Sequence, residues 1–264
     1  MKYCCLLKVY IKQEMKYKGS ILIKSLSQLI WGFMKILIFY AFYKSSDDFP
    51  TKFSSCTSYI WLEQIFLNFF AFWTIRKNIV ETIENGNIVY ELVKPIHLYS
   101  LLFFKEIFSR LSHTMTTGLT VFCIARLLPE PFKLNYPNSF KSIFLFIISL
   151  LFGFLIFLSM IIIVYTISFY IPASNGIIST FTAIVEFFSG RVIPLIFLPK
   201  KINNIIKIMP FSYTQNFCFQ IYSENLYYDN ILKGILMQIF WVFILITLGV
   251  FFMRKAQKKI IYRR

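Results

Sequence analysis

Residues 186–222 read EFFSGRVIPLIFLPKKINNIIKIMPFSYTQNFCFQIY, and this stretch decides how the chain must be built. It begins within an apolar run that predicts membrane depth, yet it contains an acid, an arginine and three prolines. Proline lacks a backbone N–H, and its ring clashes with the preceding helical turn. Lipid cannot hydrogen-bond the carbonyls that a broken helix frees, so such backbone must be buried in protein or line a wet cavity. The stretch therefore predicts an interrupted membrane span, which is typical of transport proteins.

The composition of the whole chain also indicates a membrane protein. Hydrophobic residues make up 57% of its 264 residues and charged residues only 15%, whereas about 25% of a soluble domain is charged. Several apolar runs are long enough to cross a bilayer. We therefore expect an all-α integral membrane protein whose residues 1–264 form a single transmembrane domain.

Six apolar segments match the roughly 20 residues that a helix needs to cross the hydrocarbon core. An even number of spans places both termini on the same side of the membrane. The predicted spans are residues 21–43, 58–75, 100–124, 140–165, 177–198 and 231–253.

The net charge of +16 is concentrated near the two ends of the chain and beside the apolar runs. Residues 2–18 alternate lysines with apolar residues at helical spacing, which predicts an amphipathic helix on the bilayer surface; a solvated basic tail is the alternative. Residues 254–264 are basic too. Because Lys and Arg gather on the cytoplasmic side of membrane proteins, we expect both termini to be cytoplasmic and no nucleic acid to bind.

Three ionisable residues stand out inside the predicted spans. Lys35 lies towards the middle of the first span, so we expect it to face the helix bundle or a wet cavity. Glu63 and Glu186 are isolated acids in two other spans. They could form a proton relay, or they could be satisfied by basic side chains or backbone donors. Arg191, five residues after Glu186, is a possible partner.

The third span begins with a charged turn. Lys105 and Arg110 are close enough to the inner interface for their charged ends to reach it. Glu106 and Arg110 are spaced i, i+4, which favours an ion pair on one helix face.

Residues 76–98 form the longest polar segment expected to face the cytoplasm. A helix that ends at Gly86 agrees with the preference for glycine after a helix C-terminus. A short amphipathic piece follows and is stopped by Lys94-Pro95. The segment is either an ordinary loop or a docking element, and its alternation of apolar and charged residues favours docking. The residues singled out on this segment are Glu81, Glu84, Gly86, Val89, Leu92, Lys94 and Pro95.

Sequence motifs for catalysis are missing. The chain has no Gly-x-x-x-x-Gly-Lys-Ser/Thr loop for ATP, no His-Glu-x-x-His and no Gly-x-Ser-x-Gly. Its five cysteines form no Cys-x-x-Cys pair, and they predict neither a metal site nor a disulfide framework. We expect a protein that is not an enzyme and that holds no metal or cofactor of its own.

Three stretches, in order along the chain, resemble the permease subunits of ABC-2 type ABC transporters, a bacterial six-span family. Residues 16–31 resemble the family's N-terminal entry, and residues 83–96 resemble its I-x-x-G … L-x-K-P segment. Residues 188–211 resemble its S-G-x-x-I-P-L … P … P-F pattern. The chain departs from the pattern at Arg191, where the family has an apolar residue, and in the basic residues after Pro199.

This resemblance implies an exporter in the bacterial plasma membrane. Two permeases, identical or sibling chains, would face each other, and a separate ABC ATPase subunit would bind the ATP. Residues 81–96 would be the coupling segment that docks on the ATPase. Residues 189–211 would form short helices that re-enter the membrane from outside, here called the outer gate. Its candidate residues are Ser189, Gly190, Pro194, Pro199, Pro210 and Phe211.

The alternative function is a secondary, proton-coupled transporter in which Lys35, Glu63 and Glu186 titrate. That class often contains inverted repeats, and residues 20–125 and 140–253 show no convincing similarity to each other. A membrane enzyme or scaffold is the third class. The substrate cannot be read from the apolar and aromatic content, because such residues line most membrane bundles.

Overall fold

The structure is a computed structural model that describes residues 18–45, 50–75, 77–92, 97–171 and 175–261. The amphipathic helix predicted over residues 2–18 therefore lies outside the described residues, apart from Lys18. Lys94 and Pro95 of the predicted coupling segment also lie outside them.

All regular elements within the described ranges are helices. The α-helices are α2 (Lys18–Ser45), α3 (Phe53–Ile65), α4 (Lys77–Glu84), α5 (Val89–Leu92), α6 (Leu98–His113), α7 (Leu119–Leu127), α8 (Phe140–Ser168), α9 (Asn175–Phe188), α10 (Lys200–Ile206), α11 (Asn216–Tyr222) and α12 (Tyr228–Ile261). A π-helical turn (Thr114–Gly118) joins α6 to α7, and short 3-10 turns cover Phe72–Thr74, Leu195–Phe197 and Pro210–Tyr213.

Three of the described helices are long and apolar enough to cross a membrane. They cover Gly19–Ser45, Phe140–Ser168 and Tyr228–Lys258, with 27, 29 and 31 residues. At about 1.5 Å per residue, each exceeds the roughly 30 Å of a hydrocarbon core. The 14 residues of α9 extend only about 21 Å, so this apolar helix is shorter than the roughly 30 Å of a hydrocarbon core.

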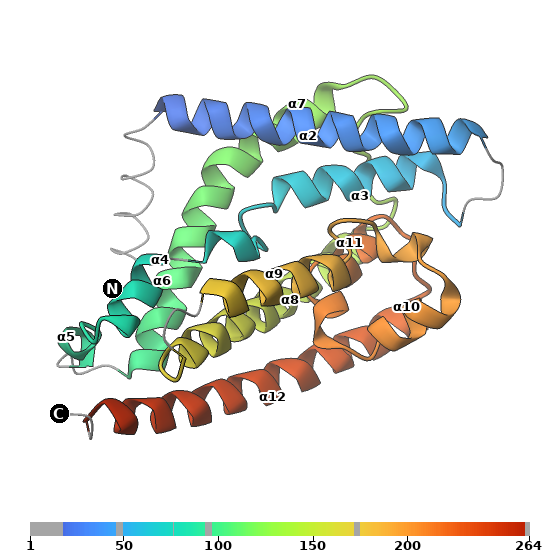
Figure 1. Cartoon of the computed structure of the whole chain (residues 1–264). Coiled ribbons are helices and arrows are strands. Elements are labelled where there is room, and N and C mark those ends of the chain that lie inside the picture. The colour runs from blue at the N-terminus through green and yellow to red at the C-terminus, as the bar shows by residue number, and fades with distance from the viewer. Residues whose placement is uncertain (1–17, 46–49, 76, 93–96, 172–174, 262–264) are drawn as a thin grey trace.

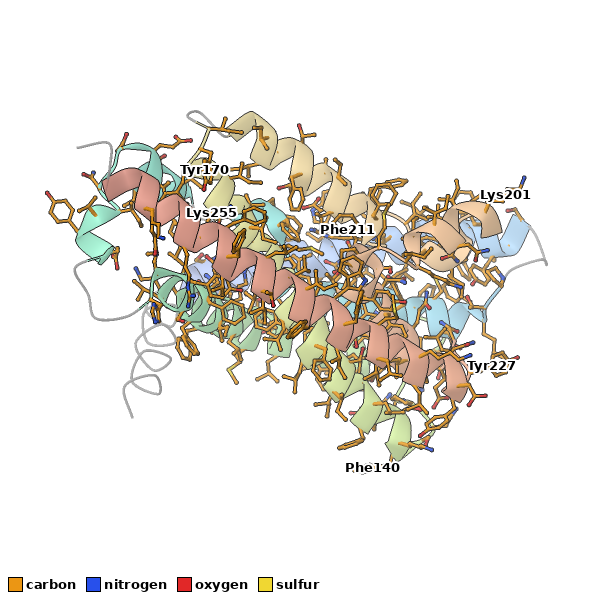
Figure 2. All side chains as sticks on the ribbon, turned by 90° about the horizontal axis from the view of Figure 1, so that it is seen from below. Phe140, Tyr170, Lys201, Phe211, Tyr227 and Lys255 are labelled. Carbon is orange, nitrogen blue, oxygen red and sulfur yellow. The ribbon has the colours of Figure 1, made fainter. Side chains whose placement is uncertain are left out.

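α2, α3, α8, α9 and α12 run in roughly the same direction, which we call the long axis, whereas α6 crosses it obliquely, and α8 and α12 pack against each other (Figure 1). The α4 and α5 helices lie at the same end of the molecule as the C-terminal end of α12, whereas α10 lies at the opposite end. Figure 2 shows the same polarity: Tyr170 and Lys255 lie towards one end, and Lys201 and Tyr227 towards the other. We call these the α4–α5 end and the α10 end.

Two helices are shorter than the spans expected from the sequence. Where residues 58–75 predict one span, α3 ends at Ile65 and is followed by turns. Where residues 177–198 predict another, α9 ends at Phe188, and Gly190 then adopts a φ of +79°. Glycine takes this left-handed conformation without the steric penalty that a Cβ brings, and it turns the chain out of the helix.

Glycines on the two long packed helices make room for α11. A Cβ on Gly153 of α8 would lie 2.1 Å from the carbonyl oxygen of Thr214, and a Cβ on Gly234 of α12 would lie 2.1 Å from the ring of Phe217. Both separations are well below van der Waals contact. The irregular segment before α12 can therefore be inserted between α8 and α12 only because neither helix has a side chain there.

Gly153→Leu should force α8 and α11 apart and destabilise the fold. Overpacking of a close contact typically costs about 1–3 kcal/mol, so we expect a lower melting temperature of the purified protein in detergent. Gly19→Leu is the matched control, since a Cβ there meets nothing within 4 Å. Equal melting temperatures for the two variants would contradict the packing argument.

Candidate functional site

A cavity of about 1050 Å³ lies along α2, and we call it the α2 cavity. Its walls come from α2, from α3 and the turns after it, from α6 and from the segment that follows α9. The lining residues are Ile23, Lys24, Ser27, Gln28, Trp31, Met34, Lys35, Ile38, Glu63, Gln64, Leu67, Asn68, Trp73, Thr74, Glu106, Ser109, Arg110, His113 and Arg191. Thus a long apolar helix has one side occupied by a cavity with charged walls.

Lys35 connects three elements from inside this cavity. Its ammonium group donates to both carboxylate oxygens of Glu63 on α3, at 2.8 and 2.7 Å. It also donates to the backbone carbonyl of Arg191, beyond the end of α9. Glu63 is only 4% exposed, and a buried carboxylate requires such a partner. The contact therefore joins α2, α3 and the start of the predicted outer gate.

Arg191 stands between Glu186 and an aromatic ring. Its Nη1 lies 3.5 Å from Oε1 of Glu186, which forms an ion pair across the end of α9. Its guanidinium lies 3.3 Å from the centroid of the Trp73 ring. A flat guanidinium on an aromatic face is attracted by the ring electrons. The two intramembrane acids of the sequence analysis therefore both have a cationic partner near the α2 cavity.

A second buried network surrounds Arg110 of α6. Its Nε donates to Glu106 at 3.0 Å, and its Nη1 donates to the backbone carbonyls of Asn68 and Ala71 at 3.2 and 2.9 Å. The hydroxyl of Tyr165 donates to the other oxygen of Glu106 at 2.9 Å. The predicted i, i+4 pair is confirmed. The expectation that Arg110 would reach the membrane interface is wrong, because its side chain is 4% exposed and supplies donors to the turns after α3.

The predicted coupling segment lies at the α4–α5 end (Figure 1). Val80 and Ile83 are buried in the core, whereas Glu81 and Gly86 are exposed. Gly86 follows α4 with a φ of +75°, the left-handed conformation expected of a residue that ends a helix.

The short helix α5 contains Val89 and ends at Leu92. Glu91 of α5 forms an ion pair with Lys105 of α6, with Nζ and Oε1 3.2 Å apart. Tyr90 is 76% exposed and was not singled out in the sequence. The segment thus has a packed inner side, an exposed outer side and a charged contact with α6.

The start of the predicted outer gate is fixed by polar contacts. Ser189 accepts a hydrogen bond from Gln215 at 3.2 Å, and the carbonyl of Gly190 accepts one from the hydroxyl of Tyr59 at 3.2 Å. The same hydroxyl lies 3.0 Å from Oδ1 of Asn216. These contacts hold the turn after α9 against α3 and α11.

The prolines of the gate mark where its short helices begin. Pro194 precedes the turn at Leu195–Phe197, Pro199 precedes α10, and Pro210 is the first residue of the turn at Pro210–Tyr213. Proline suits the position of Pro210 because its fixed φ fits a first helical turn and its missing N–H is not needed there, whereas Pro194 and Pro199 are the extended residues just before their helices. Phe211 stacks on Phe188 with ring centroids 6.2 Å apart.

The family model described as ABC-2 family transporter protein matches residues 29–261. The chain belongs to this family. A comparison with curated proteins gave no match. The protein is thus an ABC-2 type permease, a membrane protein with transmembrane helices, and the α2 cavity belongs to a transport component.

Part of the permease's cavity was not identified from the sequence. Lys24, Gln28, Trp31, Lys35 and Ile38 of α2 all line it, and steps of four, three, four and three residues place them on one helix face. Lys24, Gln28 and Lys35 form a polar stripe that could have been found from its spacing, and Trp31 and Ile38 are apolar residues on the same face. Trp73 could not have been found, because its position depends on the turns that follow α3.

Arg110→Met should destabilise the permease strongly. Removing one partner of a buried ion pair typically costs about 3–5 kcal/mol, and two carbonyls would also lose their donor. The loss should appear as a lower melting temperature and lower yield of folded protein in detergent. The double variant Arg110→Met with Glu106→Leu should recover part of it, since no buried charge is then left alone. Lys52→Met, at an exposed lysine, is the control, and a similar loss in it would refute the assignment.

Proposed function

We propose that this chain is the membrane-spanning subunit of an ATP-driven exporter. It would form the translocation path with a second permease, identical or sibling, and a separate ABC ATPase would supply the energy. The observation that carries the proposal is the α2 cavity, a space of about 1050 Å³ with charged walls on a long apolar helix of an ABC-2 permease.

The cost of placing a charge in lipid supports the assignment of the α2 cavity to the translocation path. Ionisable side chains within a membrane face the interior of a bundle or a water-filled space, since lipid cannot solvate them. On α2, Lys35 lies on such a face, whereas Leu22, Leu26, Leu37 and other apolar residues are exposed elsewhere on the helix. This division supports a polar path on one side of α2 and lipid or a second subunit on the other.

Six crossings agree with the course of the chain. They would be α2, α3 with the turns after it, α6 with α7, α8, α9 and α12. The start of α2 and the end of α12 both lie towards the α4–α5 end (Figure 1). Because the terminal segments are basic, this end would be cytoplasmic in the bacterial plasma membrane, and the α10 end would be outside.

In this orientation α4 and α5 would dock on the ATPase. The exposed Glu81, Gly86 and Tyr90 are placed to meet it, while the buried Ile83 anchors the segment. The Glu91–Lys105 ion pair would connect movement of α5 with α6. ATP binding can shift the bundle between inward-open and outward-open states only through a difference in affinity for the two.

The function is tested with inside-out membrane vesicles that contain the permease and its co-purified ATPase. A panel of labelled compounds would be screened for ATP-dependent uptake. Inhibition by vanadate and insensitivity to an uncoupler would support the ATP-driven exporter. Uptake that persists without the ATPase and ends when the proton gradient collapses would instead favour the proton-coupled carrier, with Lys35, Glu63 and Glu186 as titrating groups.

Glu84→Lys combined with Gly86→Pro should uncouple the permease. The first change reverses a charge on the coupling segment, and the second removes the left-handed glycine after α4. We expect a loss of ATPase co-purification of about tenfold with unchanged melting of the permease alone. Glu130→Lys, a reversal at a 59% exposed acid outside the segment, is the matched control. Normal assembly and normal export in the double variant would count against the coupling role.

Gly190→Leu should act on transport more than on assembly. A leucine cannot adopt a φ of +79° without strain, and its Cβ would lie 3.0 Å from the side chain of Asn216. We expect ATPase co-purification close to that of the wild type and ATP-dependent uptake reduced by about tenfold or more. The opposite pattern, with lost docking and intact uptake, would overturn the assignment of residues 189–211 as an outer gate.

A further inference from the structure

Arg191 has hydrogen-bonding capacity that the folded chain does not use. A guanidinium carries five N–H donors. Within the described residues, however, its side chain makes an ion pair with Glu186 at 3.5 Å, lies on the face of Trp73 and interacts electrostatically with Glu63, but donates no hydrogen bond. Nη1 is buried without a hydrogen-bond partner there. An arginine at this depth is costly unless its donors are satisfied, so its position in the α2 cavity is suited to an acceptor from outside the chain.

The other basic groups near the middle of the cavity are engaged by the protein. The ammonium of Lys35 has three donors, and these meet the two oxygens of Glu63 and the carbonyl of Arg191. Arg110 binds Glu106 and two backbone carbonyls. Nη2 of Arg110 makes no hydrogen bond within the described residues either, but Arg191 is the least engaged of these three cations, since no hydrogen bond from its side chain is found there.

The acids of the cavity argue against a cationic ligand. Glu63 is paired with Lys35, Glu106 with Arg110, and Glu186, beside the cavity, with Arg191. A ligand ammonium would have to displace a protein cation from one of these carboxylates. An acidic group would need only the donors that Arg191 has left.

On the α2 side, the wall combines apolar side chains with a buried polar atom. Trp31, Met34 and Ile38 line the α2 side of the same cavity. Gln28 is 4% exposed, and its Oε1 has no hydrogen-bond partner within the described part of the chain. Rotation of the amide can present either its oxygen or its NH₂ group. An apolar wall next to unused polar groups fits a molecule that has both characters.

We propose that Arg191 binds the acidic group of an amphiphile in the α2 cavity and thereby determines the substrate class of the exporter. A carboxylate or phosphate would accept two parallel N–H bonds from the guanidinium. Trp73 holds the guanidinium plane in place, and the aliphatic or aromatic body of the ligand lies against Trp31, Met34 and Ile38. The inference deepens the proposed function and rests on the α2 cavity being part of its path.

The test measures ligand binding to the full chain in phosphatidylcholine nanodiscs. Dodecyl phosphate, dodecanol and dodecylamine are titrated, and the fluorescence of Trp31 and Trp73 reports occupancy of the cavity. We expect dodecyl phosphate to bind most tightly. Arg191→Leu should weaken it by about tenfold to a hundredfold, the range for a charged hydrogen-bonded contact. Arg191→Lys should lie between, since lysine keeps the charge but not the fork.

Two further variants separate binding from folding. Glu186→Gln should bind dodecyl phosphate more tightly than the wild type, because the competing carboxylate is gone, and misfolding cannot produce a gain. Arg254→Leu removes an exposed cation from α12 and should bind like the wild type. Equal affinity of wild type and Arg191→Leu, or equal affinity for dodecyl phosphate and dodecanol, would overturn the proposal.

The source of the acid is distinguished by exchanging the lipid. Competition by phosphatidylglycerol nanodiscs would identify an anionic lipid headgroup as the occupant, and unchanged affinity would identify a free acidic amphiphile; both results support the role of Arg191. ATPase co-purification is measured on the same variants. An Arg191→Leu variant that still co-purifies with the ATPase but no longer binds dodecyl phosphate supports the inference. If the wild-type chain binds dodecyl phosphate but never assembles with an ATPase, the proposed function alone is refuted.

Discussion

The hydrogen bonds of Arg110 to the carbonyls of Asn68 and Ala71 are the contacts on which the rest of the structure depends. Lipid cannot solvate carbonyls of irregular backbone, so the turns that follow the end of α3 at Ile65 need donors from the protein. Arg110 is itself kept in place by Glu106, which Tyr165 of α8 also binds. One buried ion pair thus supports the turns that follow α3, and these turns form part of the wall of the α2 cavity.

The need to satisfy irregular backbone also explains the part of the cavity wall near Arg191. The chain leaves α9 after Phe188, and polar groups of the turn that follows form hydrogen bonds with side chains of α2 and α3 and with Gln215, directly before α11. Lys35 and Tyr59 both donate to backbone carbonyls of this turn. The turns after α3 and after α9 each receive hydrogen bonds from polar side chains of other helices, and residues of both turns line the α2 cavity. The proposed transport path would need such polar walls.

The regions for which a function is predicted are separated along the long axis of the permease. The predicted coupling segment lies at the α4–α5 end, the predicted outer gate begins towards the other end, and the α2 cavity lies along α2 (Figure 1). α6 connects two of these regions, since Lys105 contacts Glu91 of α5 and Arg110 supports the turns beside the cavity. A movement of α5 would therefore have a direct structural route to the cavity wall.

By itself, the sequence determined the class of the protein and the breaks after α4 and α9, but it did not predict that α3 ends at Ile65. Apolar length and composition indicate membrane helices, because burial of backbone in lipid permits few other structures, and Gly86, Gly190 and the gate prolines mark turns through their own restricted or permitted φ. Only the tertiary structure decided which charges meet. Arg110 is buried against the carbonyl of Asn68, and Lys35 binds Glu63. The partners in these contacts are 28 residues or more apart in the sequence, so no local sequence pattern predicts them. The α2 cavity exists for the same reason, as a product of helix packing.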